Sequence, residues 1–377
     1  MNLNVNGVWY CLLCIAFSAC QFTQPPAFIG KNAIVSIEDV DTQLPVFQKI
    51  QEAIDSAPAN GETWSIVILP GEYNERVVIN RDNVTLLGQG KIKPRIVYGR
   101  YAGQKVHAHS EETWGTFRTA TLEINGKDIS LVNLRVENSF DYPANERLAI
   151  NAPNKVRGEQ AVALKIGKRA DRTIISNSQL LGYQDTLYVN GGRSYFKGGE
   201  IHGHVDFIFG NGNALFDGVD IISRARTKKV EHSGFITAPS TLLYNEYGFT
   251  FVACRLLREN GVAEDSVPLG RPWHPTTTFS DGRYANPNAV GKSVFINTFM
   301  DAHISHDGWT TMGGTLKDGT RKQFDPINDA RFYEYKSFGP GAKVNDSRPQ
   351  LMPDQVEQYR INTILEGWGK RVNSIDF

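Results

Sequence analysis

Apolar residues recur through the middle of the chain in pairs whose two members stand five positions apart. Three successive pairs are separated by 21 and 20 residues, and the pairs outside them by 44 or 35 residues. A strand-like unit that repeats about every 20 residues is typical of a solenoid, in which each coil buries its apolar face only by stacking on the next. Because no helical pattern lies between the units, the spacing predicts an all-β parallel β-helix, with an ordinary β-sandwich as the alternative. The pairs are Leu131 and Val136, Ile175 and Leu180, Phe196 and Ile201, Phe216 and Ile221, Phe251 and Leu256, and Phe295 and Met300.

The segments on either side of the repeats follow other patterns. Apolar residues at helical spacing predict a helix over about residues 46–56, and residues 64–69 form a short strand that ends at Pro70 and Gly71. From about residue 325 the repeat is lost, and residues 353–365 (PDQVEQYRINTIL) are helical in pattern with a proline at their start. We expect this last segment to cap or flank the solenoid.

The N-terminus carries a short apolar run at residues 8–19, which is too short to span a bilayer. Small residues at Ser18 and Ala19 indicate a signal peptide over residues 1–20 and hence a secreted, extracellular protein. One alternative is a buried N-terminal strand. Another is a lipid anchor on Cys20, which the aromatic residue three positions earlier, Phe17, disfavours.

Composition and charge narrow the class of protein. Hydrophobic residues make up 41% and charged residues 21%, as in ordinary folded domains. Basic and acidic residues both number 40, so the formal net charge is zero and the basic excess typical of nucleic-acid binding is absent. The four cysteines suit neither a disulfide framework nor a zinc site. The basic run at residues 224–229 (RARTKK) is expected to be a solvated loop.

Two aspartates take the same place on successive repeats, since Asp185 follows Ile175 by ten residues and Asp206 follows Phe196 by ten. Stacked strands lie about 4.8 Å apart, so the two carboxyl groups are expected to be neighbours. Two unit charges about 5 Å apart repel by roughly 3 kcal/mol at an effective dielectric constant of about 20. We therefore expect the pair to share one proton, which gives one nucleophile or base and one general acid. The alternative is that one aspartate caps a turn and the other pairs with an arginine.

Other polar residues fit the same chemistry. Gln184 adjoins Asp185, and Gln160 stands 24 residues earlier, about one coil away. Their amides can donate hydrogen bonds to an oxyanion, although a structural role in turns is the alternative. Arg271 can orient an aspartate by a charge-assisted hydrogen bond, and Trp273 can stack on a sugar ring or pack in the core. The chain has no GxSxG, HExxH or Walker motif.

Five motifs stand out along the chain: GEYNE at residues 71–75, QAVAL at 160–164, GYQDTLY at 182–188, VDFIFG at 205–210 and LGRPWHPTTTFSDGRY at 269–284. In these motifs the chain resembles the pectin methylesterases, or pectinesterases, and above all those of plant-pathogenic bacteria and plant-feeding beetles. The resemblance covers about residues 28–368 and implies a right-handed parallel β-helix with short flanking helices, so we expect residues 28–370 to form the catalytic domain.

The resemblance also implies a role for each site residue. Asp206 attacks the methyl ester, and Asp185 protonates the leaving methanol and then activates water. Gln160 and Gln184 hold the oxyanion, and Arg271 hydrogen-bonds the nucleophile. The residues expected to line the sugar cleft are Trp273, Phe209, Val205, Thr276 and Met312.

The expected partner is the polysaccharide pectin, acted on by a monomer that needs no metal, no other cofactor, no nucleic acid and no membrane. Two other classes of protein remain as alternatives. One is a β-helix enzyme that cleaves the pectin chain, either a polygalacturonase or a calcium-dependent pectate lyase. The other is a non-catalytic polysaccharide-binding protein on the same scaffold.

Overall fold

The computed structural model describes residues 30–368. The predicted signal peptide at residues 1–20, together with Cys20, lies outside the described residues. One compact unit begins at Lys31. Within residues 30–368, no helix has both the length and the apolar character that a membrane crossing requires.

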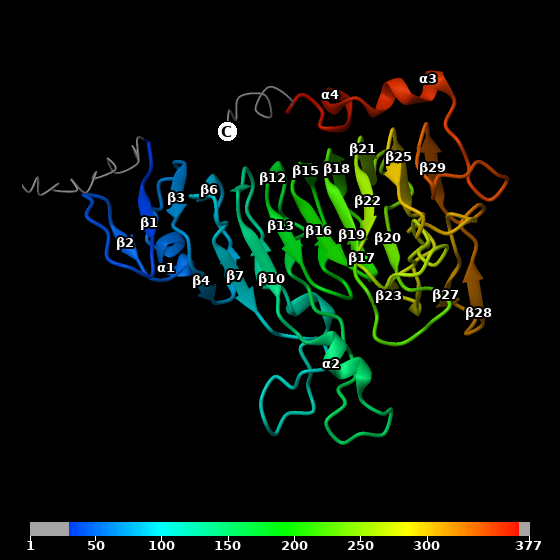
Figure 1. Ribbon diagram of the computed structural model, residues 1–377, viewed down its shortest axis with the longest axis horizontal. Coiled ribbons are helices and arrows are strands. Elements are labelled where there is room, and N and C mark those ends of the chain that lie inside the picture. The colour runs from blue at the N-terminus through cyan, green and yellow to red at the C-terminus, as the bar shows by residue number, and fades with distance from the viewer. Residues whose placement is uncertain (1–29, 369–377) are drawn as a thin grey trace, which may run out of the picture. The chain divides into compact units, whose positions relative to one another are not determined.

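Three parallel sheets, named A, B and C here, form the solenoid of this unit (Figure 1). Each complete coil adds one strand to each sheet in the order C, A, B, as β17, β18 and β19 do. Sheet A runs β2 (Val46–Phe47), β1 (Ala33–Val35), β3 (Trp64–Ile68), β6 (Val84–Gly88), β9 (Ser130–Val132), β12 (Thr173–Ser176), β15 (Arg193–Lys197), β18 (Asn213–Asp217), β21 (Phe249–Val252), β25 (Lys292–Ile296) and β29 (Arg331–Tyr335). Sheet B runs β4 (Glu72–Asn74), β7 (Arg95–Tyr98), β10 (Arg135–Asn138), β13 (Gln179–Leu181), β16 (Glu200–Gly203), β19 (Asp220–Ser223), β22 (Arg255–Arg258) and β26 (Phe299–Met300). Sheet C runs β5 (Val77–Ile79), β8 (Leu122–Ile124), β11 (Leu164–Ile166), β14 (Leu187–Val189), β17 (Val205–Gly210) and β20 (Phe235–Pro239).

The predicted parallel β-helix is confirmed, and so is its register. The first members of the apolar pairs are direct partners along sheet A, from Leu131 in β9 to Phe295 in β25. The second members are direct partners along sheet B, from Val136 to Met300. Inside the coils the phenylalanines stack in a column, with ring centroids 4.6, 4.4 and 4.4 Å apart from Phe196 through Phe216 and Phe251 to Phe295. This column is part of a larger apolar core of mostly aliphatic side chains, and burial of that core stabilises the fold.

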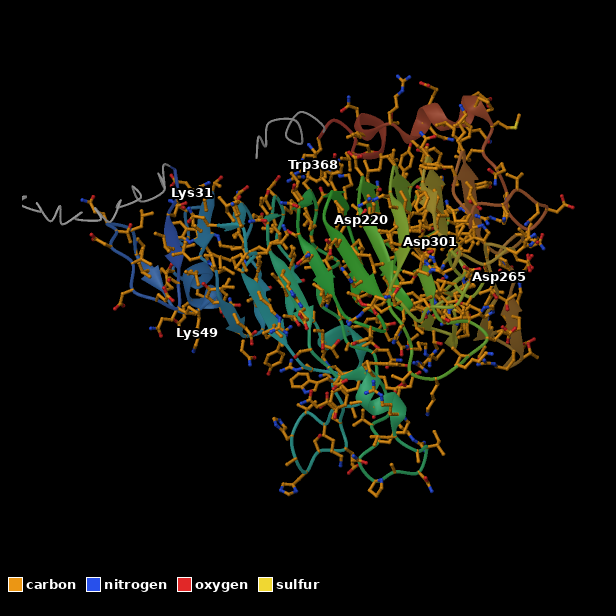
Figure 2. The ribbon with its side chains drawn as sticks, viewed as in Figure 1. Lys31, Lys49, Asp220, Asp265, Asp301 and Trp368 are labelled. Carbon is orange, nitrogen blue, oxygen red and sulfur yellow. The ribbon has the colours of Figure 1, made fainter. Side chains whose placement is uncertain are left out.

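The outer face of sheet B carries ion pairs between neighbouring coils. Arg255 pairs with Asp220, and Arg258 pairs with Asp301 at 3.1 Å. Asp220 and Asp301 are labelled among the side chains in Figure 2. The neighbouring apolar side chains of the same strands, such as Ile221 and Leu256, point inward to the core.

The flanking segments agree with the predictions in part. The strand predicted at residues 64–69 is β3, but the predicted helix over residues 46–56 starts too early. Residues 46 and 47 form β2, which hydrogen-bonds to β1 through Pro45 and Phe47, so the helix α1 spans only Ile50–Asp55. Pairing with a free strand edge here outweighs the helical spacing of the apolar residues.

The C-terminal segment flanks the solenoid, as predicted. Its helical region consists of α3 (Pro353–Val356), the 3₁₀ helix η2 (Glu357–Tyr359) and α4 (Ile361–Ile364), with Arg360 extended between the last two. Tyr359, Ile364 and Trp368 are buried against the outer face of sheet A. The break at Arg360 therefore divides a helix that the sequence pattern predicts as continuous.

Candidate active site

Sheet C carries both predicted catalytic aspartates at the entry to neighbouring strands. Leu187 in β14 pairs with Ile208 in β17, and this register gives Asp185 and Asp206 equivalent positions on adjacent coils. The backbone N–H of Asp185 donates to the carbonyl of Val205 at 3.1 Å. Both aspartates have left-handed backbone angles, with φ of 65° and 51°. Aspartate tolerates this conformation better than most residues, which helps to explain its use at both positions.

Arg271 holds the carboxyl group of Asp206 with two hydrogen bonds. Its Nε donates to Oδ1 at 2.8 Å and its Nη2 donates to Oδ2 at 2.6 Å. The guanidinium lies over the ring of Phe235, 3.9 Å from the centroid, and the Arg271 backbone N–H donates to Thr237 in β20. A bidentate arginine fits a carboxylate anion and fixes its orientation. Asp206 is thereby presented as an oriented anion, although it is only 7% exposed.

Asp185 lies in a different electrostatic environment. Burial raises the pKa of its carboxyl group well above the usual range, the negative charge of Asp206 raises it further, and the positive charge of Arg271 only partly offsets both. Among residues 30–368, no side chain or backbone group hydrogen-bonds to this carboxyl group. The two aspartates therefore suit opposite roles, a protonated acid beside an ionised carboxylate.

The two predicted oxyanion donors are also brought to these coils. The backbone N–H of Ala161, the residue after Gln160, donates to the carbonyl of Gln184 at 3.1 Å. Both glutamine side chains are partly exposed. Neither amide has a hydrogen-bond partner in the part of the chain that the structure describes. Both amides are thus available to a ligand, and no side-chain hydrogen bond within residues 30–368 supports the alternative role in turns.

An aromatic cluster adjoins the aspartates on the outer face of sheet C. Trp273 is partly buried, with its ring 5.8 Å from that of Phe209 and 6.4 Å from that of Phe117. Phe209 stacks on Tyr188 at 4.6 Å and is only 3% exposed, whereas Phe117 is 46% exposed. Phe209 therefore forms the buried base of this aromatic cluster, and Trp273 and Phe117 are its solvent-accessible members. Tyr188 was missed, although it stands 21 residues before Phe209 and the repeat spacing marks the two as partners.

The remaining predicted cleft residues come from three places. Val205 opens β17 and is partly exposed. Thr276 is exposed in the hairpin of β23 (Thr276–Phe279) and β24 (Gly282–Ala285), and Met312 is partly exposed in the hairpin of β27 (Met312–Thr315) and β28 (Arg321–Phe324). The two hairpins pack together through β24 and β27. The predicted sugar contacts of these three residues stay predictions.

A buried clamp on helix α2 (Tyr142–Arg147) joins two loops beside the site and was missed from the sequence. Glu146, 4% exposed, accepts hydrogen bonds from Arg226 at 2.8 and 2.6 Å and from the Thr227 backbone at 2.7 Å. Asn145, 6% exposed, hydrogen-bonds to Glu159, the residue before Gln160. The basic run at residues 224–229 was predicted to be a solvated loop, but Arg226 and Thr227 within it bind the buried carboxylate of Glu146.

Aromatic contacts connect helix α2 to the two segments that carry the aspartates. Tyr142 of α2 packs edge-on against His204 at 4.2 Å and stacks with Tyr183 at 5.8 Å. His204 and Tyr183 each stand two residues before a catalytic candidate, and the His204 N–H donates to the Tyr183 carbonyl at 3.0 Å.

In residues 30–368 there is no group of three or more His, Cys, Asp or Glu side chains placed to hold a metal ion.

Comparisons with known proteins identify the family and the fold. A model of the pectinesterase family matches residues 33–350. Pectinesterase A of Dickeya chrysanthemi is 43% identical over 375 residues, which cover 98% of this chain and 99% of that protein. A crystal structure of a pectin methylesterase in complex with a hexasaccharide is 44% identical, with a TM-score of 0.85 over 90% of this chain and 98% of that one. The rice weevil pectin methylesterase is 25% identical, with a TM-score of 0.61 over 79% and 87%. The chain belongs to the pectinesterase family.

Proposed function

We propose that this enzyme hydrolyses the methyl esters of pectin, with Asp206 as nucleophile and Asp185 as acid and base, and releases methanol. The main observation is the asymmetry of the pair. Asp206 receives both hydrogen bonds from Arg271, whereas burial and the neighbouring charge raise the pKa of Asp185. The hexasaccharide bound to a 44% identical relative supports a pectin chain as the ligand.

In the first step, a carboxylate oxygen of Asp206 attacks the carbonyl carbon of the ester. The amides of Gln160 and Gln184 donate to the oxygen that becomes negative, and Arg271 keeps the nucleophile oriented. Asp185 gives its proton to the methoxy oxygen as the carbon–oxygen bond breaks, so the leaving group departs as methanol. The product is an acyl-enzyme in which the galacturonyl group is bonded to Asp206.

In the second step, Asp185 is a carboxylate and takes a proton from water. The hydroxide attacks the acyl carbon, the bond to Asp206 breaks, and Asp206 returns to its anionic form. Asp185 is again protonated, and the new galacturonic acid loses its proton to solvent. Each cycle consumes one water and leaves both aspartates as they began.

We further propose that the enzyme acts as a secreted monomer on plant cell-wall pectin. The signal peptide predicted at residues 1–20 supports secretion. The net charge of zero leaves no overall repulsion against an anionic polymer.

Methanol and chain length, measured together on highly methylated pectin, test the function. The expected result is methanol release in proportion to new carboxyl groups, with no shortening of the chain. Shortened chains indicate a polygalacturonase or a lyase instead, and pectin binding with neither product indicates a non-catalytic protein.

A further inference from the structure

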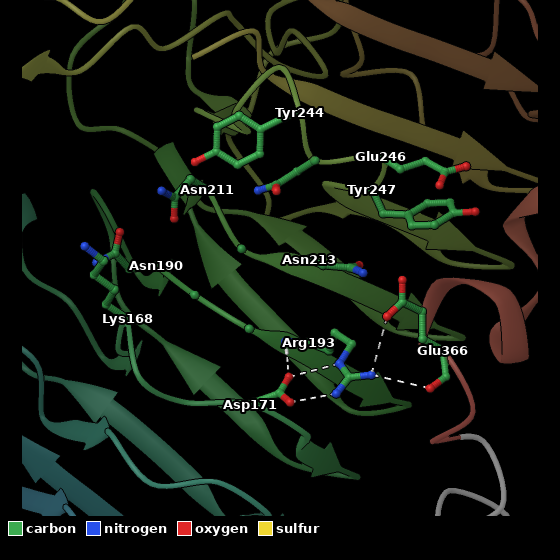
Figure 3. A pocket seen from close by; sticks show the side chains of 14 residues that line it. Lys168, Asp171, Asn190, Arg193, Asn211, Asn213, Tyr244, Glu246, Tyr247 and Glu366 are labelled. Atoms are coloured by element: carbon green, nitrogen blue, oxygen red, sulfur yellow. Dashed lines mark hydrogen bonds and ion pairs between the residues drawn. The ribbon is translucent and has the colours of Figure 1, made fainter. Parts of the chain in front are cut away.

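A polar pocket of about 540 Å³ lies where strands of sheet C turn into strands of sheet A, away from the aspartates. Figure 3 shows Lys168, Asn190, Asn211 and Tyr244 gathered at one end, and Glu246 toward the other. The pair of Asp171 and Arg193 closes part of the wall, with Nη2 and Oδ2 2.7 Å apart. The proposed mechanism uses none of these residues.

Asn190 and Asn211 occupy a corner position of the coils at which, on earlier coils, asparagine side chains hydrogen-bond to each other. The strand register puts Asn80, Asn125, Asn190 and Asn211 at the same corner position of their coils. On the two earlier coils, Asn125 donates to the side chain of Asn80 at 3.0 Å, so those amides stabilise the corner itself. On the two later coils, the side-chain amides of Asn190 and Asn211 have no hydrogen-bond partner within residues 30–368. These two amides face a cavity and are free to bind a ligand.

The other groups at this end suit an acidic sugar. Tyr244 is 78% exposed, which is unusual for an aromatic ring, and it stands over Asn211 (Figure 3). Lys168 is exposed and has no ion pair among the described residues. A flat ring, two amides and one ammonium group match the apolar face, the hydroxyls and the single carboxylate of a galacturonate unit. Glu246 and Glu366 at the far end disfavour a second carboxylate there.

The pocket is in line with the catalytic pair. Asn190 follows Asp185 by five residues, and Asn211 follows Asp206 by five. At about 3.3 Å per residue, this is a separation of roughly 17 Å along the strands. Tyr188 and Phe209 of the aromatic cluster stand between the two places on the same strands. A polymer engaged at the aspartates is thus within reach of the pocket.

We propose that this pocket is a second binding site for galacturonan, which holds a distant part of the polymer while an ester is hydrolysed at the aspartates. It rests on the proposed function, because the ligand is the substrate of that reaction. Lys168 binds one carboxylate, Asn190 and Asn211 bind hydroxyls, and Tyr244 stacks on the ring.

The test compares Tyr244→Ala and Asn190→Ala with the unchanged enzyme on two substrates, methylated pectin and methylated digalacturonate. Each variant is expected to raise KM for pectin about three- to tenfold, the loss that goes with one contact of this kind, with kcat unchanged. The dimer is too short to reach the pocket, so its kinetics are expected to be unaltered. Leu243→Ala is the matched control, since Leu243 is an exposed neighbour in the same loop outside the pocket lining.

Three outcomes overturn the inference: an unchanged KM for pectin in both variants, an equal rise on the dimer, or an equal effect of Leu243→Ala. Methanol release by the unchanged enzyme is scored separately. If it is absent on both substrates, the proposed function fails. If it is present and the variants behave like the unchanged enzyme, only the second site fails.

Discussion

Replacement of Asp185 by asparagine is expected to abolish most activity while making the folded protein more stable at neutral pH. Because the pKa of Asp185 is raised in the folded chain, the folded state keeps a proton that the unfolded chain releases above about pH 4. Stability therefore falls as the pH rises from about 4 to the pKa of the folded state, and the loss persists above it. Asparagine cannot ionise, so the variant does not suffer this loss.

The size of the effect follows from the spacing of the strands. Two unit charges about 4.8 Å apart repel by roughly 3 kcal/mol at an effective dielectric constant of about 20, burial adds to this cost, and Arg271 offsets part of it. We expect Asp185→Asn to gain about 1 to 3 kcal/mol at pH 7. With an unfolding entropy of about 2 cal/mol/K per residue over roughly 340 residues, the melting temperature rises by about 1.5 to 4 °C.

The assay is thermal unfolding of both proteins between pH 3.5 and 8. The difference is expected to be near zero at the lowest pH and to grow as the pH rises. Asp171→Asn is the matched control of opposite sign. Burial opposes ionisation of Asp171, but hydrogen bonds from Arg193 and the charges of Arg193 and Arg172 lower its pKa. That variant should be less stable at neutral pH. An Asp185→Asn protein no more stable than the unchanged enzyme at pH 7 would refute the reasoning.

Other substitutions test the remaining parts of the account. Gln160→Ala should lower kcat about 10²-fold, as expected for loss of an oxyanion donor, and an unchanged kcat removes Gln160 from the site. Glu146→Gln should lower the free energy of unfolding by about 2 to 3 kcal/mol in urea titrations, because Arg226 loses the charge of its buried partner; a loss under about 0.5 kcal/mol contradicts the clamp. Phe216→Ala should cost about 3 to 5 kcal/mol in the same assay, since it opens a cavity inside the phenylalanine column, and a cost near 1 kcal/mol means that the column collapses around the gap.

The fold and the pairing of the aspartates were predictable because both follow from the number of residues in each coil. Each coil must place an apolar side chain over the one below, so the spacing from Ile175 to Phe196 also fixes the spacing from Asp185 to Asp206. The repeat thus carries positional information over long distances. The same count marks Tyr188 as the partner of Phe209.

Contacts made by insertions between coils were not predictable. Glu146 meets Arg226 across 80 residues, and the path of both loops depends on packing that no local pattern records. The left-handed backbone at Asp185 and Asp206 likewise leaves no mark in composition. Strand pairing also outweighed helical spacing at residues 46–47, where a free edge of β1 was available.

The central claim is that Asp206 and Asp185 act as one catalytic unit in ester hydrolysis. The most direct measurement is the rate of methanol release by Asp206→Asn, by Asp185→Asn and by the protein with both substitutions, each shown to be folded. Residues that act as a unit are strongly non-additive, so we expect each single variant to lose at least about 10³-fold and the double variant to lose little more. Losses that multiply, or a single variant with near-normal turnover, would contradict the shared mechanism.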